Sequence, residues 1–399
     1  MLVPHLFGAT LLYLLCGGAL AASLSPDDAV AAALSSNPDL AVAQAELTAA
    51  SGNVRQSSFF RENPEVEGGW AVIGDRLDAS VSQALSITGE GLADHRSARA
   101  RRSAAEAGVR RARLEVAADT RAAYVEAVLA HQTAGFAKAG FDLASHQLAA
   151  TEARVRVGES SDLELRLARL AQATAAGEFL AVGAEEAASF ARLSTLAGRP
   201  VVGDDLVADP LDAAPLPEAM AVEERSDVVA ARQELRAAEA AAFREHAAAF
   251  PALSLGAFYE VEGSTVTAGP AVGITVPLWH QNGAAIAVAR GDVSVANARL
   301  TAAIARADAD VRTASAANAS AVTTMSAVPA THEDALAALA SIEAGSRAGE
   351  LDLVTTILLR GEVFSGQAAL AAARADLALA RITLLLATED DALLGGVAP

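Results

Sequence analysis

The chain has almost no cysteine. Cys16 is the only one in 399 residues, so no disulfide forms within one molecule. Cys16 follows Leu15, whereas the cysteine of a lipoprotein anchor follows a small residue. We therefore expect Cys16 to be removed with the segment that contains it rather than to carry a lipid.

Aromatic residues are also scarce. They make up 4% of a chain that is 52% hydrophobic, because alanine supplies much of the apolar content. Alanine is the best helix former, and its small side chain lets helices approach closely. The composition therefore predicts long packed helices with little bulky core.

Basic residues are outnumbered. The chain has 30 Lys and Arg against 49 Asp and Glu, a net charge of -19 at pH 7. Proteins that bind nucleic acid normally show a basic footprint, so this charge speaks against a nucleic-acid partner. A cation-conducting lumen tolerates such a charge, and so does a secreted soluble protein. Residues 96–113 are locally rich in arginine, which fits either a solvated helix face or a surface near lipid headgroups.

A long hydrophobic run is missing. Beyond the amino terminus no segment has the roughly 20 consecutive apolar residues of a membrane-spanning helix. Residues 1–21 contain a shorter apolar run, Leu11 to Leu15, and end in an Ala-x-Ala pattern at Ala21. This predicts an export signal peptide. The region before the run lacks Lys and Arg, which leaves another start position open.

Catalytic patterns are missing too. The seven histidines are scattered, and no two have the close spacing that metal ligation on one helix face requires. We therefore expect no enzyme: no catalytic residue, no cofactor and no bound metal.

Two pairs of short amphipathic strands are predicted, in residues 64–87 and 251–279. Apolar residues fall on alternate positions, as at Leu253 and Leu255, which gives each strand one apolar and one small or polar face. Phe258 is the exception. Each strand has about the ten residues that a tilted strand needs to cross a bilayer. Four strands cannot close around a lumen, so they either pack on their own helices or join strands of other copies. The second option predicts an oligomer.

Long helical patterns surround these strands. The run from Ser25 to Asp28 is typical of a capped helix start, and Asn37-Pro38 breaks and restarts the helix. A long helix is predicted over residues 89–157, and a return helix over residues 160–197 carries leucines in coiled-coil spacing. The turn between them, at Gly158, reverses the chain.

The second half of the chain repeats the first. Residues 22–210 form the first repeat, residues 211–220 a linker and residues 221–399 the second repeat. The second repeat has its own first helix, a strand pair at 251–279, a long helix at 282–347 and a return helix at 351–388. Matched residues, such as Val81 and Val272 or Gly158 and Gly349, stay 188 to 191 positions apart. This regular offset indicates an internal duplication.

The duplicated plan resembles the TolC-type outer-membrane factors of bacterial efflux systems. The residues that carry the resemblance are the run from Leu24 to Val30 before Asn37-Pro38-Asp39-Leu40, and Val276 to Trp279 before Asn282-Gly283. A third carrier is the pair of Gly-Glu tips. The compact length and the Pro277-Leu278-Trp279 join look most like the branch that serves heavy-metal (cobalt-zinc-cadmium) cation efflux.

The resemblance implies a fold that is mainly α with membrane β. A homotrimer shares one transmembrane β-barrel, with four strands from each chain, and a long α-helical coiled-coil barrel. The implied location is the bacterial outer membrane, with the helical part in the periplasm. The implied partners are outer-membrane lipid, a periplasmic adaptor (membrane fusion) protein and an inner-membrane efflux pump. The implied function is export of small solutes, heavy-metal cations among them.

Three sets of site residues follow. If the apolar strand faces meet lipid, the opposite faces line the barrel lumen with Glu65, Glu67, Glu260 and Glu262. Adaptor docking is expected at the two tips, where glycine permits the chain to reverse; the tip residues are Arg156, Gly158, Glu159, Arg347, Gly349 and Glu350.

The third set forms the tunnel mouth and gate. Many family members carry acidic rings six and nine residues past the second tip glycine, positions that hold Thr355 and Leu358 here. The acids stand instead at Glu350 and Asp352, with Glu164 at the matching place in the first half. We expect cation attraction to move from the usual ring to the mouth.

The alternative interpretation is a periplasmic adaptor or a soluble helical scaffold protein. An adaptor has one helical hairpin flanked by compact β-domains, whereas here both the hairpin and the strand pair are duplicated.

Overall fold

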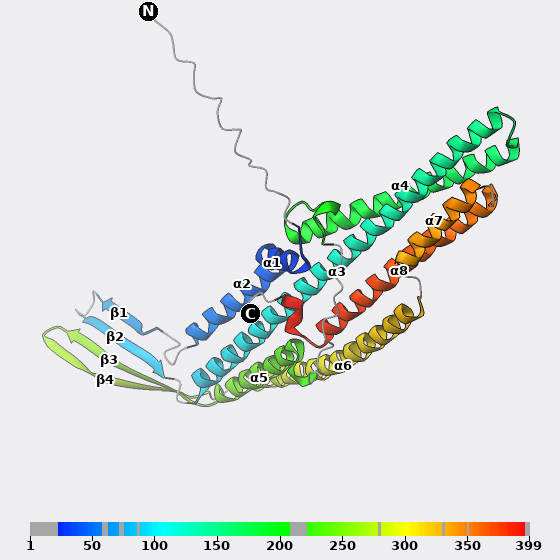
Figure 1. Ribbon diagram of the computed structural model, residues 1–399. Helices are drawn as coiled ribbons and strands as arrows, with labels where there is room; N and C mark the ends of the chain where they lie inside the picture. Colours follow the sequence, from blue (N-terminus) through cyan, green and yellow to red (C-terminus); the bar gives the residue numbers. More distant parts are fainter. Residues whose placement is uncertain are drawn as a thin grey trace, which may run out of the picture.

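The computed structural model describes residues 23–57, 63–71, 76–85, 88–207, 222–277, 281–328, 332–348 and 351–395. The molecule is elongated, with a sheet at one end, a layer of helices in the middle and helical hairpins at the other end (Figure 1). The predicted signal peptide, residues 1–21, and the predicted linker, residues 211–220, lie outside the described residues.

The first helices begin where the sequence caps them. Ser25 Oγ accepts a hydrogen bond from the Asp28 N–H at 3.1 Å, and the Asp28 carboxylate accepts one from the Ser25 N–H at 3.3 Å. Asn37 ends the first helix and caps the second by accepting from the Asp39 N–H at 2.8 Å. The helices are α1 (Pro26–Ser36), α2 (Pro38–Gln56), α3 (Glu90–Arg156), α4 (Asp162–Ala197), α5 (Ser226–Ala247), α6 (Gly283–Ala327), α7 (His332–Ala348) and α8 (Leu353–Ala387), with short 3-10 helices η1 (Gly203–Asp205), η2 (Val222–Glu224) and η3 (Asp391–Leu394).

The second long helix is shorter than predicted. A single helix over residues 282–347 is wrong, because α6 ends at Ala327 and α7 begins at His332. Val328 has an extended conformation, with φ -92° and ψ 93°. The next residue is Pro329, and proline disfavours the helical conformation of the residue before it. In the first repeat α3 has no such proline and runs unbroken to the tip.

The four strands form one antiparallel sheet in the order β1-β2-β3-β4, so the strand pairs of both repeats join at β2 and β3. The helices continue this arrangement. α3 contacts α2 and α5, and α5 contacts α6. Away from the sheet, α3 packs with α4 and α7 packs with α8, as two hairpins (Figure 1). The strands are β1 (Glu65–Ala71), β2 (Arg76–Leu85), β3 (Ala252–Glu262) and β4 (Thr265–Thr275).

The core of the helical layer is built largely from alanine, as the composition predicts, with a few larger anchors. Tyr124 on α3 is fully buried, and its hydroxyl donates to the Leu24 carbonyl at 2.7 Å. The same hydroxyl accepts from the Val207 N–H at 2.9 Å. This one side chain therefore ties the start of the described chain and the segment after α4 to the middle of α3.

A buried arginine ties the second repeat together. The Arg225 side chain is 2% exposed and makes ion pairs with Asp227 at 2.7 Å and Asp310 at 3.2 Å. It also donates to the carbonyls of Ala307 on α6 and Ala387 at the end of α8, at 3.3 and 3.2 Å. The start of α5 is thus fixed to both α6 and α8.

A carboxylate from the carboxyl-terminal segment completes this junction. Glu389 is buried, and its Oε2 accepts hydrogen bonds from the backbone N–H and the hydroxyl of Ser226 at 2.8 and 2.7 Å. Arg225 provides no side-chain cap of its own for α5. A negative charge at a helix amino terminus is favourable, so Glu389 caps α5 from a distant part of the chain.

We predict that Arg225→Ala lowers the free energy of unfolding by about 3 kcal/mol, because it leaves the buried carbonyls and the paired carboxylates without their cation. The expected value lies at the lower end of the usual range because Asp310 is half exposed. The measurement is the thermal unfolding midpoint of the detergent-solubilised protein. Arg236→Ala, at an exposed position on the same helix, should leave the midpoint unchanged; equal midpoints for both variants would contradict the prediction.

Candidate functional site

The register of the sheet places the apolar residues of all four strands on one face. Val66 of β1 is opposite Val81 of β2, Val81 is opposite Ala257 of β3, and Ala257 is opposite Pro270 of β4. Side chains alternate between faces along a strand, so the neighbouring rows two residues away share this face. Its large apolar residues are solvent-exposed in the single chain: Val66, Trp70, Leu77, Val81, Leu255, Tyr259, Val266, Val272 and Ile274.

This apolar face has the size of a membrane band. From Leu253 to Val261 the strand β3 extends about 26 Å at 3.3 Å per residue. At the usual tilt of about 40° this gives a height of about 20 Å, close to the apolar band of outer-membrane barrels. Trp70 is 74% exposed near one edge of the face and Phe250 is 63% exposed beside the other, where the strands meet the helices. Aromatic residues prefer the two edges of such a band.

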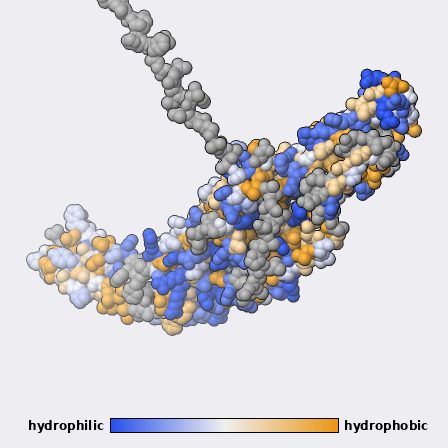
Figure 2. Space-filling view, viewed as in Figure 1, coloured by the Kyte–Doolittle hydropathy of each residue, from blue (hydrophilic) through white to orange (hydrophobic). Residues whose placement is uncertain are grey.

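The surface colouring fits this distribution. Figure 2 shows hydrophobic residues interspersed over the strand end and dense at the junction between strands and helices, while hydrophilic residues are frequent in the middle of the molecule. Within the described part of the chain, no helix has the length and apolarity to cross a membrane.

The opposite face of the sheet carries the predicted acidic residues. Glu65 and Glu67 are exposed on β1, and Glu262 is exposed at the end of β3. Glu260 forms an ion pair with Arg76 of β2 at 3.0 Å, a neutralising partner that the sequence pattern did not reveal. The register therefore groups all four carboxylates on the polar face, as predicted from the alternation.

Phe258, the exception to the alternation, has a structural explanation. It lies on the polar face directly opposite Gly269 of β4. A Cβ atom at Gly269 would lie 3.4 Å from the phenylalanine ring, so the ring covers the bare glycine backbone.

The first tip joins α3 to α4. Gly158 has φ +80°, a conformation that suits glycine, and the N–H of Glu159 donates to the Arg154 carbonyl at 2.9 Å. Arg156 and Glu159 are exposed. Nothing lies within 4 Å of a Cβ placed at Gly158, so its need for glycine comes from the backbone and not from packing.

The second tip is described only in part. Gly349 and Glu350 lie outside the described residues, and for Arg347 only its place on α7 is described. After the tip, Asp352 caps α8 by accepting from the Thr355 N–H at 2.7 Å. The two tips therefore lead into return helices that begin with a side-chain cap.

Two of the predicted mouth acids, Glu164 and Asp352, act as helix caps. Glu164 accepts from the Ser161 N–H at 2.8 Å and from the Ser160 hydroxyl. Hydrogen bonds from the Ser160 side chain and then the Ser161 backbone lower the pKa of Glu164. Hydrogen bonds from the side chain and backbone of Thr355 likewise lower the pKa of Asp352.

These lowered pKa values have a consequence for pH dependence. Both caps contribute fully to stability above the ordinary carboxyl pKa, and the contribution is lost as the pH falls through the lowered one. Both carboxylates are charged at neutral pH.

The two predicted ring positions hold no acid. Thr355 donates its N–H to the Asp352 carboxylate, and the Leu358 side chain is 65% exposed.

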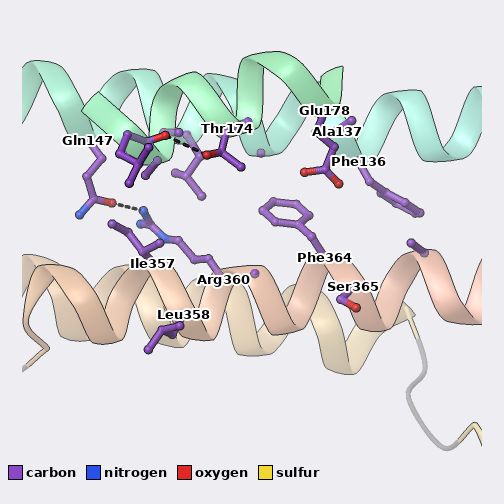
Figure 3. Close-up of a pocket in the computed structure, with 18 of the residues that line it drawn as sticks. Phe136, Ala137, Gln147, Thr174, Glu178, Ile357, Leu358, Arg360, Phe364 and Ser365 are labelled. Atoms are coloured by element: carbon purple, nitrogen blue, oxygen red, sulfur yellow. Dashed lines mark hydrogen bonds between the residues drawn. The ribbon is translucent and has the colours of Figure 1, made fainter. Parts of the chain in front are cut away.

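A groove that the sequence did not reveal lies between the two hairpins. It has a volume of about 670 Å³ and is lined by residues of α3, α4 and α8 (Figure 3). Coiled-coil spacing predicts which residues face a neighbouring helix, but it does not predict where two hairpins diverge. Leu358, expected at the gate, is one of the lining residues.

In the described residues, no group of three or more His, Cys, Asp or Glu is arranged to hold a metal ion. Of the four predicted lumen carboxylates, two lie on β1 and two on β3, and Glu260 is already paired with Arg76 of β2.

Solved structures resemble the chain over nearly its whole length. The CmeC outer membrane channel of Campylobacter jejuni matches with a TM-score of 0.76 and 17% identity, covering 91% of this chain and 85% of CmeC. CusC matches with a TM-score of 0.75 and 19% identity, covering 92% of each chain. A membrane protein from Pseudomonas aeruginosa matches with a TM-score of 0.75 and 19% identity, covering 91% of this chain and 93% of that one.

These similarities confirm the predicted fold class, a mainly helical chain with a small antiparallel sheet of the outer-membrane channel type. No curated protein matches the chain. Residues 219–388 match the family described as outer membrane efflux protein. This match covers most of the second repeat, and the whole chain has the fold of the solved outer-membrane channels.

Proposed function

We propose that the protein is the outer-membrane channel of a tripartite efflux system and works as a homotrimer. The observation that carries this proposal is the four-stranded sheet, which has an exposed apolar face and two open edges. In a bilayer every backbone polar group needs a partner, so a sheet spans a membrane only when it closes.

Three copies provide the closure. Both β1 and β4 are edge strands in the single chain, and an exposed edge is a template for pairing with another strand. If β4 of one copy pairs with β1 of the next, three sheets of four strands give twelve strands without an edge. The apolar faces then meet lipid, and Glu65, Glu67, Glu260 and Glu262 line the lumen.

The helical part gives the tunnel and the docking surface. Each chain contributes two hairpins that point away from the sheet (Figure 1), so a trimer presents six tips on one ring. A ring of similar tips suits repeated contacts with a periplasmic adaptor, which in turn connects to an inner-membrane pump. The duplication of hairpin and strand pair favours this function over an adaptor or a soluble scaffold.

The proposed cargo is small solutes and, more specifically, heavy-metal cations. The Pro277-Leu278-Trp279 join and the compact chain support that branch, and the acidic lumen face favours cations.

The membrane face is tested by placing a charge on it. Val272→Arg puts a cation on the apolar face and should cost about 2–4 kcal/mol near the bilayer midplane. Thr275→Arg lies on the polar face of the same strand and should be mild. The measurement is the yield of folded protein extracted from outer membranes with detergent. A similar loss of yield for both variants would show that the two faces do not differ in environment.

The docking tips are tested without touching their glycines. The double variant Arg156→Ala and Arg347→Ala should still insert and form trimers but lose export and crosslinking to the adaptor. Arg166→Ala, an exposed position further along α4, is the matched control and should export normally. Full export and normal crosslinks in the double variant would show that the two arginines do not take part in docking and that the tips serve only to reverse the chain.

Single-channel recording tests whether the acidic residues at the mouth, rather than the usual ring positions, attract cations. Glu350→Gln and Asp352→Asn should lower the selectivity of the channel for cations, because both remove a negative charge at the mouth. Asparagine caps a helix about as well as aspartate, so Asp352→Asn keeps the start of α8 and changes only the charge. Unchanged selectivity in the combined variant would contradict the proposed displacement.

A further inference from the structure

The groove between the hairpins has the dimensions of a small-molecule site. Its volume of about 670 Å³ falls in the range of about 300–1,000 Å³ that is usual for ligand pockets. Its walls are mostly aliphatic and aromatic, with contributions from α3, α4 and α8. The main apolar residues are Phe136, Leu143, Leu167, Val182, Ile357 and Phe364.

One end of the groove is closed by a polar contact. Arg360 of α8 donates from Nη1 to Gln147 Oε1 of α3 at 2.6 Å, which joins the two hairpins (Figure 3). This end therefore places a positive charge next to the apolar walls.

The other end of the groove carries a negative charge among aromatic rings. Glu178 of α4 points toward the ring of Phe364, and Phe136 also lines this part of the groove (Figure 3). The Phe364 ring packs at ordinary contact distance over Gly140 of α3, 3.9 Å from where a Cβ would lie. Among the described residues, no hydrogen bond or ion pair occupies the Glu178 carboxylate.

We propose that this groove binds a hydrophobic organic cation, with its charged nitrogen between Glu178 and Phe364 and its apolar body along Leu143, Leu167 and Ile357. A carboxylate attracts the positive charge, and the face of an aromatic ring adds a cation–π contact. Arg360 repels a cation from the opposite end, so the two charged residues fix the orientation of the ligand.

The groove does not suit other classes of ligand. A metal ion requires several ligating side chains, and in the described part of the chain no such group exists. A hydrophobic anion would have its charge at the Arg360 end, where the guanidinium already donates to Gln147. An organic cation uses both the free carboxylate and the apolar walls.

Binding here has a mechanical consequence. The ligand touches the α3–α4 hairpin on one side and α8 on the other, so it stabilises the arrangement in which the two hairpins lie together. A ligand that binds only the folded form raises the unfolding temperature. The site lies between α3, α4 and α8, and none of its lining residues belongs to the sheet.

The test uses the full-length protein purified in detergent and ethidium as the probe cation. Fluorescence polarisation should show saturable binding of ethidium and none of fluorescein, an anionic dye. Glu178→Gln should raise the Kd roughly tenfold, and Phe364→Leu should also weaken binding. Glu185→Gln is the matched control, because it removes an exposed carboxylate two turns further along α4 that does not line the groove.

A second variant separates the groove from general charge effects. Ala171→Phe fills the groove without altering any charge, and it should abolish saturable binding while the protein keeps its oligomeric state and helix content. Ethidium should raise the unfolding temperature of the wild type and not that of Ala171→Phe. Absence of saturable binding to the wild type, or equal binding to the wild type, Glu178→Gln and Ala171→Phe, would overturn the proposal, whatever the outcome of the membrane tests.

Discussion

The structure depends on a sheet that one chain cannot complete. Its four strands leave two edges without backbone partners, and one of its faces exposes large apolar side chains to solvent. Exposing this apolar face to water is unfavourable, and the unpaired backbone N–H and C=O groups of the two edges are unfavourable in a bilayer. In the proposed trimer, closure with further copies satisfies both demands at once, and the helices continue the arrangement of the strands.

The helices can form a closely packed layer that continues the sheet, because they are rich in alanine. Small side chains let α2, α3, α5 and α6 lie closely side by side as a layer, in continuation of the strands. The few large buried groups are placed where distant segments meet. Tyr124 ties two segments to α3, and Arg225 with Glu389 ties α5 to the end of α8. Each of these junctions lies within one repeat: Tyr124 joins segments of the first, and Arg225 with Glu389 joins helices of the second.

Much of this architecture could be predicted from local patterns. The Ser25 capping box, the restart at Asn37 and the alternation of the strands each depend on neighbouring residues, and the structure confirms them. The expected single helix over residues 282–347 ends early at Ala327, because Pro329 disfavours the helical conformation of Val328. The pairing of Arg76 with Glu260 and the groove around Phe364 depend on contacts between distant segments, which a sequence pattern does not encode. The caps made by Glu164 and Asp352 are local contacts of the same kind as the Ser25 capping box.

Closure of the sheet between copies can be tested by disulfide crosslinking in a Cys16→Ser background. Single cysteines are placed in pairs, one in β1 (Glu65–Ala71) and one in β4 (Thr265–Thr275). Within one chain these strands are three strand spacings apart, about 14 Å, whereas a disulfide requires Cα atoms within about 7 Å. The account predicts that at least one pair in register links copies into dimers and trimers and no larger species. Failure of every pair to link copies, with a monomeric mass in detergent, would contradict it.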